Sequence, residues 1–453
     1  MKNTFSGWRY LWKSQDIRSK LLMTLLILVI YRLAANIPVP GIDGNLLKQV
    51  LEKQAGSFVA FIDMLSGGTV SNFSLLSMGV YPYITAQIII QLLVPIFPAL
   101  QRRMQEDPRE GRKLQERWTY YLAVPMAALS AIGQINIFNS LAESGQVVPF
   151  GFTAGLWLSS IATLLTMVGG TMFAIWLGEL ISEYGIRGQG LSLIIFAGIV
   201  ARIPANFGRL LSDTTNGWIL VIAMALVMVA VIFAIVYVQQ GRRNVPVMYP
   251  GRRVGNRMSM PVKGTLPLMV NLAGMIPLIF ASAILQFPTL VASWMLRSAN
   301  EGVVKFATGM YNTFNAQGSN PWIYWLLYFI FVVVLSFFYT DVMFTQQNYG
   351  DNLKKMGAQI PGVIRGAPTQ KYLTKVQRRI TLPGALFLGI VAVLPFLIGL
   401  ILNLVGINTG NSSTLFLTTS SGLLIVVGVV RDTLMNIDAE LKIHGYDEKL
   451  LVK

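Results

Sequence analysis

Long apolar runs recur along the chain, separated by shorter segments that contain Gly, Pro and charged residues. A helix that crosses the hydrocarbon core of a bilayer needs about 20 mostly apolar residues. The pattern predicts ten such spans, and we expect a helix in each. They cover residues 21–37, 75–98, 118–138, 153–178, 190–206, 217–239, 266–287, 321–343, 382–404 and 411–430.

The stretch from Phe58 to Leu100 departs from this pattern. Its first part is apolar but too short to cross a bilayer, and it contains the pair Gly67 and Gly68. Its second part is an apolar run interrupted by Gly79 and Pro82. Irregular backbone at membrane depth is tolerated only where protein buries it or a watery cavity adjoins it. Two interpretations remain open: an element of a pore or transport path, or a helix in a periplasmic loop followed by an ordinary kinked span.

The composition indicates a polytopic membrane protein. Hydrophobic residues make up 54% of the 453 residues, and only 12% are charged. Most of the 36 Lys and Arg residues fall in alternate loops, and basic loops are typical of the cytoplasmic side. We therefore expect a multi-pass protein whose N- and C-termini are both cytoplasmic.

An even number of spans with both ends on one side permits two halves of opposite topology. We expect residues 1–206 to hold spans one to five and residues 207–453 to hold the rest. Halves of this kind commonly enclose a central site or path. The sequence shows no clear residue-level repeat between them, so this prediction rests on topology.

Two predicted cytoplasmic loops, residues 241–265 and 344–380, are rich in Lys and Arg, and the tail 431–453 adds more. Basic surfaces attract acidic proteins and nucleic-acid phosphates. Positive-inside topology alone also produces basic loops. We favour docking, because topology would be satisfied by shorter loops.

The chain carries few groups that support catalysis. It has no cysteine, which excludes disulfides and thiol chemistry, and its one histidine, His444, lies in a charged tail. The motifs of nucleotide-binding loops, zinc proteases and serine hydrolases are absent. We therefore expect no enzyme activity, no cofactor and no metal site.

The carboxylates also bear on transport. A carrier coupled to protons or sodium usually has ionisable groups at the bilayer midplane. Here they lie near the ends of the predicted spans, as Glu179 and Asp341 do. This favours a passive path, and the alternative is a secondary transporter for a small solute.

Several segments, in order along nearly the whole chain, resemble the SecY family, the channel subunits of the bacterial Sec protein translocase. The segments are IPVPGID from Ile37, LSGG from Leu65, GVYPYI from Gly79, GQGLSLIIFAGI from Gly188, VNLAGMIPLIFAS from Val270 and SGLLIVVGV from Ser421.

The resemblance implies an all-α integral membrane protein of the bacterial cytoplasmic membrane. Its ten transmembrane helices would form two pseudo-symmetric, inverted five-helix halves around an hourglass channel with a plug helix and a lateral gate. Unfolded secretory proteins would cross it, and membrane-protein segments would leave it sideways into the lipid. Implied partners are SecE and SecG in a heterotrimer, the SecA ATPase or a translating ribosome as the driving force, signal sequences, nascent chains and membrane lipids.

The family's constriction is a ring of apolar side chains. Matching motif by motif assigns it here to Val80, Ile84, Leu191, Ile195, Ile279 and Ile425. The plug would be about residues 58–71, with Gly67 and Gly68 as its hinge, because glycine accepts backbone angles that other residues do not. A helix C-cap followed by a turn is the alternative for the same glycines.

The resemblance also implies a polar contact across the lateral gate. The family's asparagine of span seven is Asn271 here, whereas the usual glutamine of span three is replaced by Ser130. Span two has Gln87 where a small hydroxyl residue is typical. We hypothesise that Gln87 bonds Asn271 and keeps the gate closed; the alternative is a glutamine bonded to backbone.

Docking of SecA or the ribosome is expected on the basic loops. The candidate residues are Arg242, Arg243, Arg252, Arg253, Arg365 and Lys371. At the tip of the second loop the family commonly has the sequence PGIRPG, whereas this chain has PGVIRG from Pro361. Arg365 is thus displaced by one position, which puts its orientation in doubt.

Overall fold

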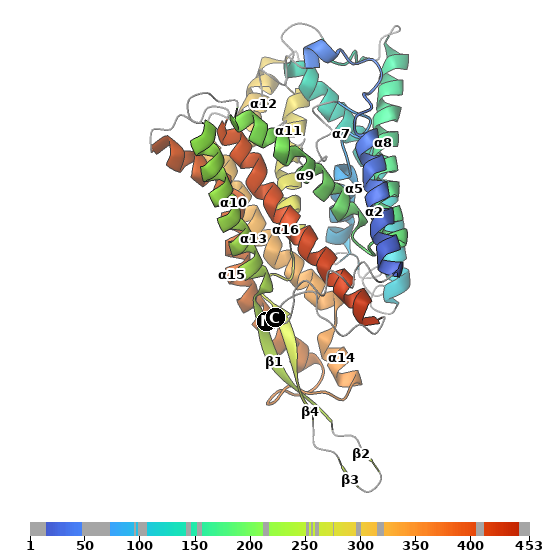
Figure 1. The fold of residues 1–453 in the computed structure, drawn as a ribbon, viewed down its shortest axis with the longest axis vertical. Helices are drawn as coiled ribbons and strands as arrows, with labels where there is room; N and C mark the ends of the chain where they lie inside the picture. The colour runs from blue at the N-terminus through green and yellow to red at the C-terminus, as the bar shows by residue number, and fades with distance from the viewer. Residues whose placement is uncertain are drawn as a thin grey trace.

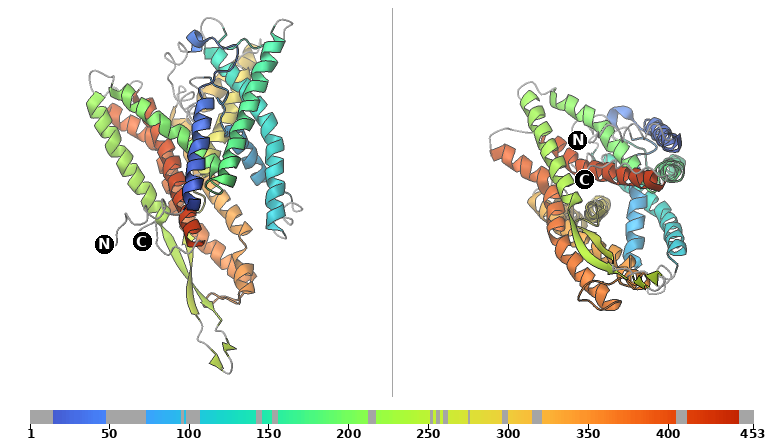
Figure 2. Two further views of the ribbon diagram at one scale, coloured as in Figure 1. Left: turned by 45° about the vertical axis from the view of Figure 1, so that its right-hand side comes forward. Right: turned by 60° about the horizontal axis from the view of Figure 1, so that its bottom comes forward.

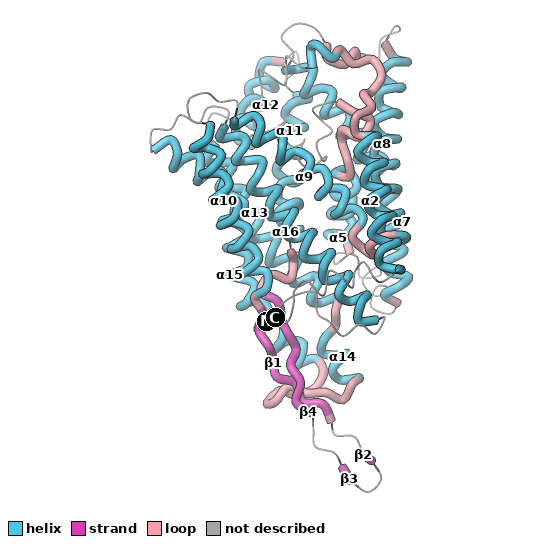
Figure 3. Tube along the Cα trace, in the orientation of Figure 1, coloured by secondary structure: helices cyan, strands magenta, loops and turns pink. Residues whose placement is uncertain are grey.

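The computed structural model of the chain describes residues 15–47, 73–94, 97, 107–141, 146–151, 156–211, 217–250, 253–254, 257–258, 262–274, 276–295, 300–314, 321–404 and 412–443. Helices dominate it, and two short antiparallel sheets project from one end of the helical bundle (Figure 1 and Figure 3). The elements are α2 (Gln15–Ala34), α5 (Tyr81–Leu93), α7 (Pro108–Leu141), α8 (Trp157–Tyr184), α9 (Gly190–Leu211), α10 (Gly217–Gln240), β1 (Arg242–Tyr249), β2 (Arg253–Val254), β3 (Arg257–Met258), β4 (Val262–Met269), α11 (Ile276–Met295), α12 (Glu301–Phe314), α13 (Pro321–Gln346), α14 (Tyr349–Lys355), α15 (Ala367–Leu404) and α16 (Ser412–Ile443).

Each predicted span overlaps one of the described helices, although the bounds differ. The agreement is closest for α10, because its apolar run is uninterrupted. By contrast, α7, α15 and α16 continue well beyond the predicted spans. Within the described residues, four helical segments are long and apolar enough to cross a membrane. They are Arg109–Asn139, Trp157–Tyr184, Pro321–Lys355 and Ala367–Leu394.

The predicted span 266–287 begins too early. Its first residues belong to β4, which pairs antiparallel with β1, so that Leu266 lies opposite Val245. Helix α11 begins only at Ile276. The end of the strand, from Leu266, and the helix form one apolar run in the sequence, and hydropathy alone does not separate a short apolar strand from a helix.

The second predicted span also starts later than expected, because residues 73–80 form turns and α5 begins at Tyr81. The N–H of Leu75 donates to the carbonyl of Ile37 over 2.8 Å. Gly79 has a φ of +52°, a conformation that glycine adopts without a steric penalty. Most of these side chains are buried, so the protein itself shields this irregular backbone.

Close helix packing is made possible by small residues between α8 and α9. A Cβ added to Gly190 would lie 1.7 Å from the carbonyl oxygen of Gly178. Only glycine at position 190 therefore allows α9 to begin directly against α8. This contact fixes the start of α9, which carries Leu191 and Ile195 into the centre of the bundle.

A separate unit, which we call the lobe, consists of β1, β4, α14 and the residues of α15 before position 381. Its apolar core includes Val247, Leu268, Leu353 and Leu373, all of which are buried. Met248 and Gln359 exchange two backbone hydrogen bonds, which attach the loop after α14 to β1. The lobe extends away from the bundle at the end where α2 starts and α16 ends (Figure 2).

Candidate functional site

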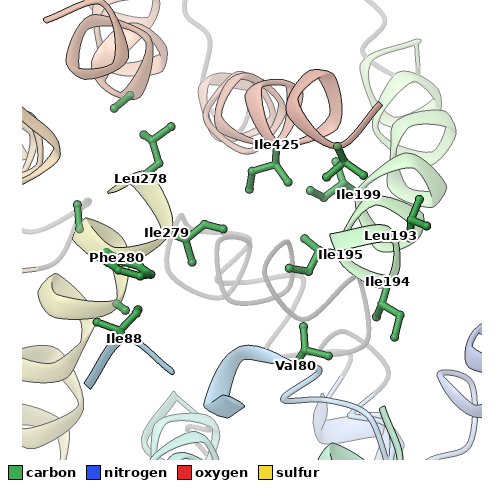
Figure 4. Close-up of a cluster of buried hydrophobic side chains, with 14 of the residues drawn as sticks. Val80, Ile88, Leu193, Ile194, Ile195, Ile199, Leu278, Ile279, Phe280 and Ile425 are labelled. Atoms are coloured by element: carbon green, nitrogen blue, oxygen red, sulfur yellow. The ribbon is translucent and has the colours of Figure 1, made fainter. Parts of the chain in front are cut away.

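The centre of the bundle is a large apolar cluster to which α2, α5, α9, α11, α13, α15 and α16 all contribute. Four of the predicted ring residues are buried in it, with exposed fractions of 1% for Val80, 4% for Ile195, 6% for Ile279 and 3% for Ile425. Figure 4 shows these four side chains pointing toward a common centre from four different elements. The structure therefore brings them together.

The other two predicted ring residues, Ile84 and Leu191, are partly buried and pack against the same cluster. Ile84 follows Val80 by one turn, since its N–H donates to the carbonyl of Val80 over 3.1 Å. Val80 itself is the N-cap residue of α5, just outside the helix. The first turn of α5 therefore places Val80 and Ile84 one above the other, as the spacing of four residues predicts.

The arrangement determines what this centre can do. Val and Ile side chains offer no hydrogen-bond donor or acceptor, so an opening lined by them loses its water and resists ions. Their β-branching restricts χ1, which holds the shape of the lining. An apolar lining also has no fixed polar partner for any particular peptide sequence.

Ile199 also belongs to this centre, although it is not among the six predicted ring residues. It follows Ile195 by one turn of α9, is 6% exposed, and lies beside Ile425 of α16 in Figure 4. Side chains four apart lie on one helix face. Ile199 could have been identified from the sequence, because Leu191, Ile195 and Ile199 follow one another at intervals of four residues.

The expected hydrogen bond between Gln87 and Asn271 is absent from the structure, in which both residues are described. Instead, Asn271 Nδ2 donates to the carbonyl of Gly274 over 3.1 Å, and its Oδ1 accepts from the N–H of Gly274 over 2.9 Å. Asn271 lies in the turn before α11, where asparagine commonly bonds nearby backbone. Gln87 and Ser130 are half-buried on α5 and α7.

Gln134 is a buried polar residue of α7 that is not among the residues predicted for the gate. It lies one turn after Ser130 and is 4% exposed, and neither amide atom has a hydrogen-bond partner within the described structure. A buried amide without a partner is costly. The sequence gives no signal for this, because burial of one glutamine among apolar residues depends on tertiary packing.

The predicted docking residues lie on or beside the lobe where they are described. Arg242 and Arg243 are exposed on β1. Arg365 is exposed, and its Nε donates to Oε1 of Gln359 over 3.1 Å. Lys371 lies on α15, also exposed. Arg253 belongs to β2.

Three predicted site residues, Gly67, Gly68 and Arg252, lie outside the described residues, as does the proposed plug at 58–71. Within the part of the chain that is described, no group of three or more His, Cys, Asp or Glu side chains is placed to hold a metal ion.

A groove of about 660 Å³ lies between α14 and α15. It is lined by Asn348, Asp351, Gly366, Ala367, Gln370, Lys371, Thr374, Lys375, Arg378 and Arg379. Four of these side chains are cationic and one is acidic. Arg378 also forms an ion pair with Asp341 of α13, with 2.7 Å between Nη2 and Oδ2.

Comparison with known proteins gives a consistent result. The family model described as SecY matches residues 74–434. A protein translocase subunit SecY from Streptomyces galbus is 36% identical over 452 residues, covering 96% of this chain and 97% of the relative. The protein of the same name from Vibrio cholerae is 34% identical over 442 residues and covers 96% and 94%.

Solved structures share the fold. One described as a protein-conducting channel superimposes with a TM-score of 0.62 and covers 96% of both chains, at 19% sequence identity. A second, from work on the plug domain of the SecY protein, gives the same TM-score and coverage.

Proposed function

The chain belongs to the SecY family of multi-pass membrane proteins, and on this basis we propose that it forms the protein-conducting channel of a translocase. Unfolded secretory proteins would cross the membrane through it, and membrane-protein segments would leave it sideways into the lipid. The observation that carries this proposal is the apolar centre in which Val80, Ile195, Ile279 and Ile425 meet.

The chemistry of the centre suits this task. Bulky aliphatic side chains exclude water and ions from a narrow opening when no peptide occupies it. They also accept any passing sequence, because they form no specific hydrogen bonds. A secondary transporter, the alternative function, would need polar groups to bind its solute at this depth, and the six proposed ring residues are all Val, Ile or Leu.

The lateral exit is proposed between α5 and α7 on one side and α11 and α13 on the other. The contacts of α11 with both α5 and α7 support a seam at this place. Gln87 of α5, Ser130 and the buried Gln134 of α7, and Asn271 before α11 are the polar residues proposed to act there. Residues 58–71 are proposed as the plug, with Gly67 and Gly68 as its hinge.

The energy for transport is proposed to come from outside the chain, which has no enzyme activity in this scheme. The SecA ATPase or a translating ribosome would dock on the basic loops. Their contacts would be Arg242, Arg243, Arg252, Arg253, Arg365 and Lys371. SecE and SecG are the proposed partner subunits.

The proposed location is the bacterial cytoplasmic membrane, with both termini and the lobe on the cytoplasmic side. The concentration of Lys and Arg in the loops of that side supports this orientation. The start of α2, the end of α16 and the lobe all lie at one end of the bundle, which agrees with it (Figure 1).

A crosslinking experiment tests the proposal, since the natural chain has no cysteine. Ile195→Cys places one thiol in the apolar centre, and Leu165→Cys places one on the exposed side of α8. A secretory chain stalled during export should crosslink to the first variant and not to the second. No crosslink at position 195, together with uptake of a small solute into proteoliposomes, would favour the transporter.

A further inference from the structure

One face of helix α15 carries basic side chains in its first part and apolar side chains in its second part. Lys371, Lys375 and Arg379 follow one another at intervals of four residues and are all exposed. Residues at this spacing lie on the same side of a helix. The face therefore begins as a basic strip that lines the groove beside α14.

The same face continues as an exposed apolar strip. Leu382, Leu386 and Ile390 follow Arg379 at intervals of three or four residues, and their exposed fractions are 52%, 39% and 51%. Side chains this apolar and this exposed on a membrane helix are suited to contact with lipid chains. The basic groove is thus continuous with an exposed apolar strip.

Helix geometry places the cations relative to the lipid. With a rise of about 1.5 Å per residue, Arg379 lies about 4.5 Å, Lys375 about 10 Å and Lys371 about 16 Å before Leu382 along the axis. The polar headgroup layer is about 5 to 8 Å thick on each side of a bilayer. With Leu382 at the edge of the hydrocarbon core, Arg379 would lie within this layer, and the flexible side chain of Lys375 would reach it from just outside.

We propose that the groove between α14 and α15 binds the headgroup of an anionic phospholipid whose acyl chains lie along Leu382, Leu386 and Ile390. Arg379 and Lys375 contact the headgroup phosphate. Lys371, farther from the bilayer, remains accessible to a soluble partner. Continuity of the basic and apolar strips favours a lipid over a nucleic acid or an acidic protein, since neither of those needs the apolar strip.

Lipid retention tests the proposal directly. The purified protein is reconstituted with equal amounts of phosphatidylglycerol and phosphatidylethanolamine, extracted in mild detergent, and its retained lipids are counted by native mass spectrometry. We expect the natural chain to retain phosphatidylglycerol preferentially. Arg379→Gln and Lys375→Gln should each reduce that retention about five-fold, the effect expected for one basic side chain at an anionic surface.

Lys355→Gln is the matched control. Lys355 is an exposed cation of α14 in the same lobe, but it does not line the groove. This variant should retain phosphatidylglycerol as the natural chain does. An equal loss in Lys355→Gln, or unchanged retention in Arg379→Gln, would overturn the proposal.

Two further results would also overturn it. Soluble glycerol phosphate that displaces phosphatidylglycerol at equal concentration would show that the apolar strip contributes nothing. Loss of ribosome or ATPase binding in Arg379→Gln, with lipid retention intact, would assign the groove to a macromolecule. The assay measures lipid alone, so its failure is distinguishable from failure of the proposed channel function.

Discussion

Gly170 of α8 lies directly against the carbonyl of Leu75. A Cβ added to Gly170 would be 1.9 Å from that oxygen and 2.7 Å from the carbonyl carbon. Both of these atoms of Leu75 belong to the backbone, so they cannot rotate away as a flexible side chain would. This contact holds the irregular segment 73–80 against α8, and that segment ends at Val80 in the apolar centre.

We expect Gly170→Ala to destabilise the protein by about 1 to 3 kcal/mol, the usual cost of overpacking. The added methyl group must displace Leu75, and this would shift the segment that leads from Leu75 to Val80. Thermal unfolding in detergent measures the effect. The matched control is Gly169→Ala, because a Cβ there meets nothing within 4 Å and alanine favours helix. Equal destabilisation in both variants would contradict the argument.

A polar residue in the apolar centre should weaken its resistance to ions. Ile195→Asn places an amide among Val80, Ile279 and Ile425, and an amide holds water where an aliphatic group does not. We expect a several-fold rise in ion leak through proteoliposomes that contain the variant. Ile195→Leu conserves the volume and should leave the leak unchanged. A leak that did not rise in the asparagine variant would argue against the centre as the seal.

Gln134→Leu should stabilise the protein by about 1 to 3 kcal/mol, because it removes a buried amide that lacks partners at nearly constant volume. A rise in the unfolding temperature checks this. The comparison variant is Gln377→Leu on α15, whose amide donates to the carbonyl of Met269 over 3.0 Å. That second change should destabilise. A fall in stability for Gln134→Leu would mean that its amide has a partner.

Arg365→Glu should reduce docking of the SecA ATPase or the ribosome and slow preprotein export. Gln359→Ala removes only the hydrogen bond that orients Arg365, so its effect should be smaller. Lys355→Glu makes the same change of charge elsewhere in the lobe. Export rates of the three variants separate the contribution of this arginine from that of the total charge. Export at the natural rate in Arg365→Glu would contradict the docking role.

The helices were predictable where an apolar run ended in polar residues, as for α10. The prediction was wrong at 266–274, because the end of β4 from Leu266 and the turn at Asn271 continue the apolar run of α11. Hydropathy also did not predict that α15 begins at Ala367, well before the predicted span at 382–404. A helix that continues beyond the bilayer becomes polar without ending, so the end of the apolar run does not mark the end of the helix.

The site was partly predictable for a related reason. Ile195 and Ile279 lie in regular helices within long family motifs, so their positions followed from the resemblance and helix geometry. The bond of Asn271 did not, because a flexible amide takes the nearest backbone partner, and that partner depends on the turn to Gly274. Gln134 required the packed structure itself.

The lobe has a mechanical consequence for α11. Gln377 of α15 donates to the carbonyl of Met269 at the end of β4, which ties that strand to α15. Val270 donates to the carbonyl of Gly241 over 3.0 Å, which joins the two ends of the β1–β4 hairpin to each other. Six residues lie between Met269 and Ile276, where α11 begins. A force applied to the hairpin by a docked partner would therefore act as on a lever that pivots at the contact between Gln377 and Met269. The short arm of this lever ends at Ile276, three residues before Ile279 of the apolar centre.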